Sequence, residues 1–75
     1  MGRQGSLAGM HKGSTATVKG LGGHPELRAR LQELGFVPGS QVTMVAAAAF
    51  GGALAFQVRG STVALRRADA ATILV

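Results

Sequence analysis

Few side chains in this sequence could act as an acid, a base or a nucleophile. His11 and His24 are the only histidines, and the only acidic residues are Glu26, Glu33 and Asp69. A catalytic nucleophile needs a base, and that base needs a group that orients it, yet both histidines fall in predicted loops. Glu26 and Glu33 share one predicted helix, and a carboxylate pair needs an enclosing cleft, for which so short a chain leaves little room. The sequence therefore predicts no enzyme activity, no catalytic residue and no cofactor.

The same side chains give little support for metal binding. The chain contains no cysteine, which excludes a disulfide framework and a cysteine-based zinc site. The spacing of His11, His24 and Asp69 does not match a pattern of metal ligands. We therefore interpret the two histidines as surface residues and predict no metal site.

Positive charge is the clearest chemical feature of the chain. Eight lysine and arginine residues against three acidic residues give a formal net charge of +5. A basic surface can meet nucleic acid, an acidic protein or anionic lipid. The basic residues are scattered along the chain, and we take Arg28 and Arg30, on the exposed side of the predicted helix, as candidate partner contacts.

A small nucleic-acid-binding barrel is the alternative function. Barrels of that kind stack bases on aromatic side chains. The chain has no tryptophan or tyrosine and only three phenylalanines, of which Phe36 and Phe56 are needed for the predicted core. Because charge without a stacking platform is a weak basis for binding single strands, nucleic acid ranks behind a protein partner.

Residues 46–56 are apolar on both faces of a predicted hairpin, although a strand pair covered on one side should alternate. Either its small alanines tolerate exposure, or the tip is a partner-binding patch with Phe50 as the anchor. We therefore add Phe50, Leu54 and Arg59 to the candidate partner contacts. The apolar run is too short for a bilayer span, which needs ~20 residues, so we expect no membrane insertion. The absence of cysteine favours a reducing compartment, and we expect a cytoplasmic location.

A helix is predicted over residues 25–34, and it positions much of the rest. Leu27, Leu31 and Leu34 lie on one helical face, because they are spaced by four and three residues. We expect this face to plug the core.

The residues after the helix predict how it ends and where the chain goes next. Gly35 suits a left-handed backbone, and in a Schellman ending Phe36 folds back onto Leu31. Pro38 and Gly39 suit the two central positions of a type II turn.

Apolar alternation predicts five short strands, over residues 14–20, 41–49, 53–59, 62–66 and 73–75. Tight turns are predicted at Gly51-Gly52 and at Gly60-Ser61, and one helical turn at residues 68–71. One face of the second strand is predicted to carry Val42, Met44 and Ala46, and the inward face of the third strand to carry Leu54, Phe56 and Val58.

These elements predict a mainly β fold with one α-helix, in which five strands form a small closed or nearly closed barrel and the helix is inserted between strands 1 and 2. Residues 1–6 are predicted to be a flexible N-terminal tail, and residues 7–75 a single domain.

The sequence resembles the FeoA family, the small cytoplasmic proteins of bacterial ferrous iron uptake. The resemblance is carried by Arg30-Leu31-x-x-Leu34-Gly35-Phe36-x-Pro38-Gly39, Val58-Arg59-Gly60, Ala64-Leu65-Arg66, Ala70 and Ile73-x-Val75. It covers nearly the whole chain, and its first segment is the most specific.

The resemblance implies an SH3-like barrel with an inserted helix. It also implies a non-enzymatic role, in which the protein supports or regulates the membrane ferrous iron transporter FeoB by binding its cytoplasmic part. It leaves homo-oligomer formation open. The hairpin tip departs from the proline and aspartate that are common in the family, so the contact chemistry there is expected to differ.

Overall fold

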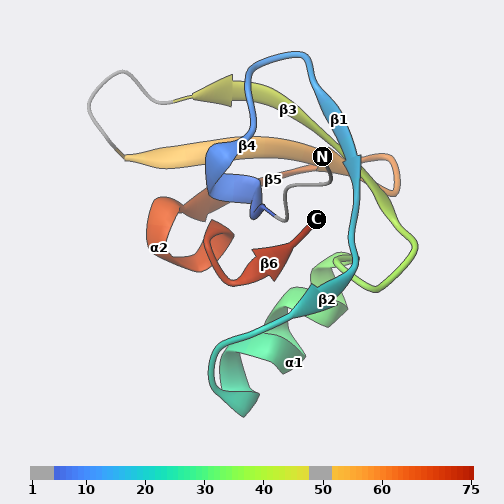
Figure 1. The fold of residues 1–75 in the computed structure, drawn as a ribbon, viewed down its shortest axis with the longest axis vertical. Coiled ribbons are helices and arrows are strands. Elements are labelled where there is room, and N and C mark those ends of the chain that lie inside the picture. The colour runs from blue at the N-terminus through green and yellow to red at the C-terminus, as the bar shows by residue number, and fades with distance from the viewer. Residues whose placement is uncertain (1–4, 48–51) are drawn as a thin grey trace.

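The computed structural model of the chain describes residues 5–47 and 52–75. Figure 1 shows a mainly β fold with one main helix, as predicted. In chain order the elements are the 3-10 helix η1 (Leu7–Gly9), β1 (Thr15–Thr17), β2 (Gly20–Leu21), α1 (Pro25–Leu34), β3 (Gln41–Ala47), β4 (Ala53–Val58), β5 (Ser61–Arg66), the short helix α2 (Arg67–Ala70) and β6 (Ile73–Leu74).

Two antiparallel sheets form the barrel. One has the strand order β1-β3-β4-β5, and the other pairs β2 with β6. The chain bends between β1 and β2 at Val18, whose N–H donates to the Ser40 carbonyl (2.9 Å) and whose carbonyl accepts from the Gly39 N–H (2.8 Å). The single strand predicted over residues 14–20 is therefore two short strands, because this bend places its second half in the other sheet.

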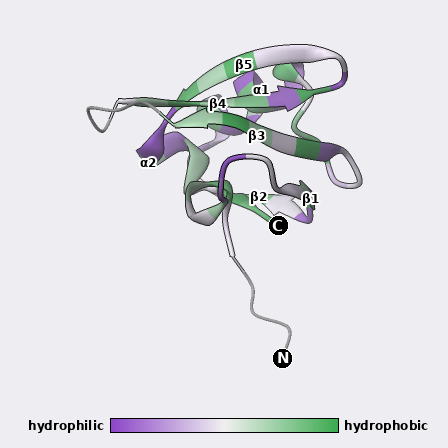
Figure 2. Cartoon of the chain, turned by 90° about the horizontal axis from the view of Figure 1, so that it is seen from above, coloured by the Kyte–Doolittle hydropathy of each residue, from purple (hydrophilic) through white to green (hydrophobic). Residues whose placement is uncertain are grey.

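The core lies between the sheets, η1 and the inner face of α1. The inward residues predicted for β4 are confirmed, since Leu54, Phe56 and Val58 are each at most 1% exposed. Hydrophobic residues predominate along β3 and β4 in Figure 2, whereas part of β5 is drawn white and α2 is hydrophilic. The buried core consists of Leu7, Val18, Leu27, Leu31, Phe36, Val42, Met44, Leu54, Phe56, Val58, Leu65, Ala70 and Ile73.

Helix α1 begins with a histidine cap and a proline. His24 precedes the helix in an extended conformation, and its Nδ1 accepts a hydrogen bond from the Leu27 N–H (3.2 Å). Pro25 occupies the first helical position, where its missing N–H costs nothing. His24 is an unusual N-cap residue, because serine, threonine, aspartate and asparagine are preferred there. The predicted helix bounds are confirmed.

The predicted Schellman ending of α1 is also confirmed. Gly35 has φ +111° and donates to the Gln32 carbonyl (3.0 Å), while Phe36 donates to the Leu31 carbonyl (3.0 Å). Phe36 and Leu31 are both buried. The type II turn follows as predicted, because Gly39 has a positive φ and the Ser40 N–H donates to the Val37 carbonyl (2.9 Å).

Two local predictions about the hairpins are wrong. A β-bulge between Met44 and Ala46 shifts the register of β3 against β4, so Ala46 is exposed and does not share the buried face of Val42 and Met44. Val58 pairs with Ser61, so the second tight turn consists of Arg59 and Gly60, one residue before the predicted position. Both turn residues have positive φ, as a type I′ turn requires.

The two ends of the described chain pair with each other. Gly5 and Val75 exchange two backbone hydrogen bonds (3.4 and 3.0 Å), and Ser6 bridges Leu74. Two residues that the sequence assigned to the tail therefore join the barrel. Across residues 5–47 and 52–75, no helix is long and apolar enough to cross a membrane.

Candidate functional site

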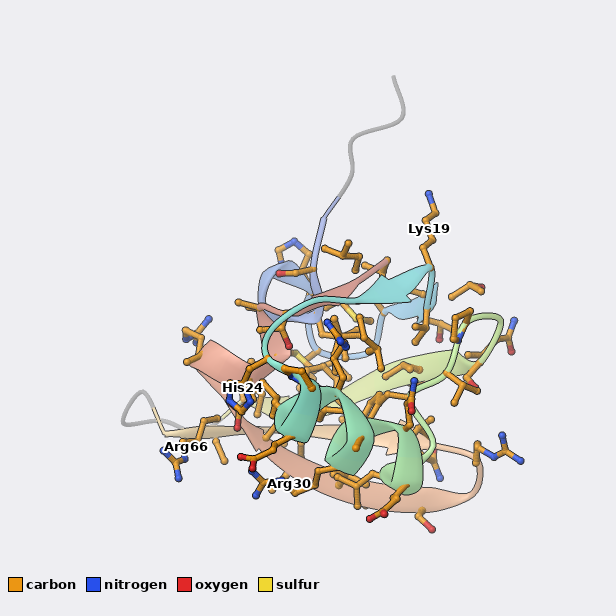
Figure 3. All side chains as sticks on the ribbon, turned by 90° about the horizontal axis from the view of Figure 1, so that it is seen from below. Lys19, His24, Arg30 and Arg66 are labelled. Carbon is orange, nitrogen blue, oxygen red and sulfur yellow. The ribbon has the colours of Figure 1, made fainter. Side chains whose placement is uncertain are left out.

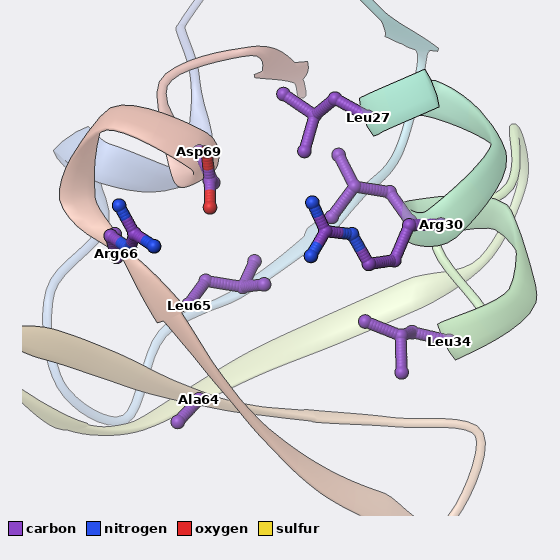
Figure 4. Close-up of a pocket in the computed structure, with 8 residues that line it drawn as sticks. Leu27, Arg30, Leu34, Ala64, Leu65, Arg66 and Asp69 are labelled. Carbon is purple, nitrogen blue, oxygen red and sulfur yellow. The ribbon is translucent and has the colours of Figure 1, made fainter. Parts of the chain in front are cut away.

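A cleft of about 210 Å³ lies between α1 on one side and β5 and α2 on the other. Figure 4 shows the residues that line it: Arg30 and Leu65 point toward one another across it, whereas the side chain of Ala64 points away. Its lining residues are Leu27, Arg30, Leu31, Leu34, Ala64, Leu65, Arg66 and Asp69. It combines leucine side chains with a charged rim, an arrangement similar to the apolar core and polar rim of a protein–protein interface.

The apolar walls come from the leucine stripe of α1 and from the inward face of β5. Leu27 and Leu31 are buried against the core, and Leu65 faces them from β5 at 6% exposure. Leu34 is 38% exposed, so the prediction that it is part of the buried plug is wrong. It lies in the last turn of α1, where the helix face lines the cleft instead of entering the core.

The cleft runs along an edge of the sheet. Ala64, Leu65 and Arg66 all line it, although successive strand residues point to opposite faces of a sheet. The side chains of Ala64 and Leu65 point to opposite faces of the sheet, so the cleft includes the flank of β5 as well as its inward face. β5 is the last strand in its sheet, so the cleft borders an edge to which no described strand is paired.

The rim of the cleft is mainly cationic. Arg30 projects from α1 and Arg66 from the end of β5, and both are exposed, while Asp69 on α2 is partly buried. Figure 3 places Arg30 and Arg66 on the side that carries α1, whereas Lys19 projects from the opposite side. Two cations on facing walls favour an anionic group of a partner between them.

The neighbouring arginines on the same two elements have other roles. Arg28 donates from Nη1 to the Gly23 carbonyl (3.1 Å), which ties the first turn of α1 to the preceding loop. Arg67 donates from Nη1 to the Ala8 carbonyl (3.3 Å) and so links α2 to η1. Neither lines the cleft, although the sequence placed Arg28 and Arg30 in one candidate group.

The three partner contacts predicted on the hairpin, Phe50, Leu54 and Arg59, have different outcomes. Leu54 is 1% exposed, so its prediction as a surface contact is wrong; it faces inward from β4. Phe50, the predicted anchor of the hairpin tip, lies outside the described residues. Arg59 is exposed but belongs to the turn between β4 and β5.

Arg59 is held in an unusual conformation beside the end of α1. Its φ is +52°, a left-handed value that costs an ordinary side chain about 1 kcal/mol. Its aliphatic stem covers Gly35, since a Cβ built on that glycine would lie 2.8 Å from Arg59 Cδ. The arginine stem therefore packs the β4–β5 turn against the C-terminal end of α1.

Other chemistry has little support among the described residues. Within residues 5–47 and 52–75, no three histidine, cysteine, aspartate or glutamate residues lie together as potential metal ligands. Phe36 and Phe56 are fully buried, so neither can stack on a base. The predicted core role of both phenylalanines is confirmed.

Sequence reasoning missed most of the cleft. The sequence identified Arg30 as a candidate contact. It did not indicate that the residues on the facing side of the cleft, Ala64, Leu65, Arg66 and Asp69, lie beside the helix. The alternation of β5 was visible in the sequence, yet its position at the end of the sheet depends on strand order. No pattern within the strand shows which neighbour it lacks.

Comparisons with known proteins agree with this fold. The sequence matches the FeoA domain family over residues 5–75. A FeoA-like protein from Clostridium acetobutylicum is 26% identical, with 99% of this chain and 86% of that one covered and a TM-score of 0.87. Zinc-complexed FeoA from Stenotrophomonas maltophilia is 32% identical over 91% of this chain and 85% of that one, with a TM-score of 0.79.

The Stenotrophomonas protein is described as a prokaryotic SH3 domain protein, put forward as a bacterial ferrous iron transport activating factor. A manganese-dependent transcriptional repressor shares the fold at 23% identity, with a TM-score of 0.86, over 96% of this chain and 40% of the repressor. Comparison of the sequence with curated proteins gave no match.

Proposed function

The chain belongs to the FeoA family, and we propose on that basis that it is a non-enzymatic protein-interaction module of ferrous iron transport. In this proposal it acts in the cytoplasm and supports or regulates the transporter FeoB by binding its cytoplasmic part. The observation that carries the proposal is the family match over residues 5–75.

The geometry supports a binding role over a catalytic one. The cleft beside α1 has leucine walls and an arginine on each side, but it brings together only one acidic side chain and no histidine. A general acid–base pair or an activated nucleophile needs at least two such groups within hydrogen-bond reach. An apolar pocket with a charged rim is instead suited to burying one side chain of a protein partner.

A direct test is a calorimetric titration of the purified cytoplasmic domain of FeoB from the same organism. The proposal predicts saturable binding by this protein. A parallel titration with a fluorescent single-stranded oligonucleotide serves as the control for non-specific charge effects. Binding of the oligonucleotide but not of the FeoB domain would overturn the proposal in favour of a nucleic-acid-binding barrel.

A further inference from the structure

We propose that β5 accepts an extended segment of the protein partner as an added strand, with one aliphatic side chain of that segment seated in the cleft beside α1. The segment is acidic next to the aliphatic residue. This inference rests on the proposed function, because it specifies how the partner is held.

The first support is the free edge of β5. The strand is six residues long, ends the four-stranded sheet and pairs only with β4 among the described strands. Outside the β4 ladder, the only group of residues 61–66 with a described backbone bond is the Arg66 carbonyl, which is the N-cap of α2 and accepts the first bond of that helix. An edge with unpaired N–H and C=O groups is a template for a further strand.

The register identifies which backbone groups point outward. Val58 and Ser61 flank the two-residue turn and form a hydrogen-bonded pair, so hydrogen-bonded pairs recur at every second residue along the ladder. Val63 and Leu65 therefore bond to β4. The N–H and C=O groups of Thr62 and Ala64 and the N–H of Arg66 point to the free edge, whereas the Arg66 carbonyl begins α2 as its N-cap.

The cleft supplies the place for one side chain of the added strand. Side chains of neighbouring strands at matched positions lie on the same face. An inward residue opposite Leu65 would therefore meet Leu65 and the leucines of α1, where the cleft of about 210 Å³ lies. An aliphatic residue is expected there, because the side chains that it would meet first, Leu65 and the leucines of α1, are apolar.

The charges around the cleft select an acidic neighbour. Arg66 is exposed at the edge of β5, and Arg30 reaches the cleft from α1 (Figure 4). Asp69 is the one acidic residue in the lining, so carboxylates of the segment are expected beside the arginines and away from the Asp69 carboxylate. A second copy of this chain is a poor occupant, because it would bring another Arg66 to a rim that is already cationic.

The decisive variant is Ala64→Pro, which removes one outward N–H while leaving the ladder with β4 intact. Thr17→Pro is the matched control. Thr17 lies in β1, at the opposite end of the same sheet, and its N–H also points outward, because the adjacent Val18 N–H bonds to Ser40. We expect Ala64→Pro to raise the Kd for the FeoB cytoplasmic domain about tenfold, and Thr17→Pro to leave it unchanged. Circular dichroism shows whether each variant is folded.

A second pair of variants tests the same edge without altering the backbone. Arg66→Glu reverses a charge on the cleft rim, and Arg67→Glu makes the same change one residue away, outside the cleft. We expect the first to raise the Kd at least about tenfold and the second less than about threefold. Equal effects of the two changes would overturn the inference, even if Ala64→Pro fails to fold.

The outcomes separate the inference from the function on which it rests. If the wild-type protein does not bind the FeoB domain, the proposed function falls and the inference falls with it. Suppose instead that the wild type binds and that, within each pair, the test variant and its control change the Kd equally. In that case the added strand at β5 is wrong and the proposed function stands. Sedimentation that shows self-association abolished by Arg66→Glu would assign the edge to a second copy instead.

Discussion

Replacing Gly35 with alanine tests how α1 is fixed to the barrel. Gly35 has φ +111°, and an added Cβ would lie 2.8 Å from Arg59 Cδ and 3.3 Å from Arg59 Cγ. The backbone conformation alone costs an L-residue about 1–2 kcal/mol. The contact with Arg59 adds less, about 1 kcal/mol at most, because Arg59 is exposed and its stem can move. We expect Gly35→Ala to lower the free energy of unfolding by about 2 kcal/mol.

A double-mutant cycle separates these two contributions. Arg59→Gly removes the stem and also relieves the positive φ at the turn. If the contact matters, Gly35→Ala costs less in the Arg59→Gly background than in the wild type, by the part that the contact contributes. The assay is urea unfolding followed by circular dichroism, with comparison of midpoints at constant slope. A cost below about 0.5 kcal/mol in the wild type would refute the left-handed ending described for α1.

Three further predictions follow from the same geometry. Because serine caps a helix better than histidine, His24→Ser is expected to raise the unfolding free energy by about 0.5–1 kcal/mol, and a lower thermal midpoint would contradict the cap described here. Leu31→Ala is expected to lower the free energy of unfolding by about 2–5 kcal/mol and Leu34→Ala by less than about 1 kcal/mol, since Leu31 is 1% and Leu34 38% exposed. Similar denaturation midpoints for the two variants would show that Leu34 is part of the core. Because arginines rim the cleft, the affinity for the FeoB cytoplasmic domain is expected to fall with added salt; calorimetry at two salt concentrations checks this, and equal affinities would remove the charged rim from the interface.

The helix and its ending could be predicted because local chemistry determines them. Gly35 and Phe36 specify the Schellman geometry within a few residues, and Pro38-Gly39 specifies the next turn in the same way. The start of α1 was less certain from the sequence, since a histidine cap depends on the imidazole turning toward Leu27.

Features that depend on strand pairing could not be predicted. The bulge beside Val45 and the bend at Val18 arise from how neighbouring strands are registered, and no residue at either position marks them. The cleft could not be predicted from the sequence for the same reason. Its walls are distant in sequence, and they meet only because β5 is the outermost strand of its sheet. The sequence predicted Leu54 both as an inward strand residue and as a partner contact. Its burial shows that it is an inward residue.

The most direct test of the account is amide hydrogen exchange along β5, followed by NMR, in the free protein and with the FeoB cytoplasmic domain. In the free protein the outward N–H groups of Thr62, Ala64 and Arg66 should exchange faster than those of Val63 and Leu65, which bond to β4. Added FeoB domain should slow the three outward amides and leave the other two nearly unchanged. Saturated binding with no slowing at these three positions would contradict the account.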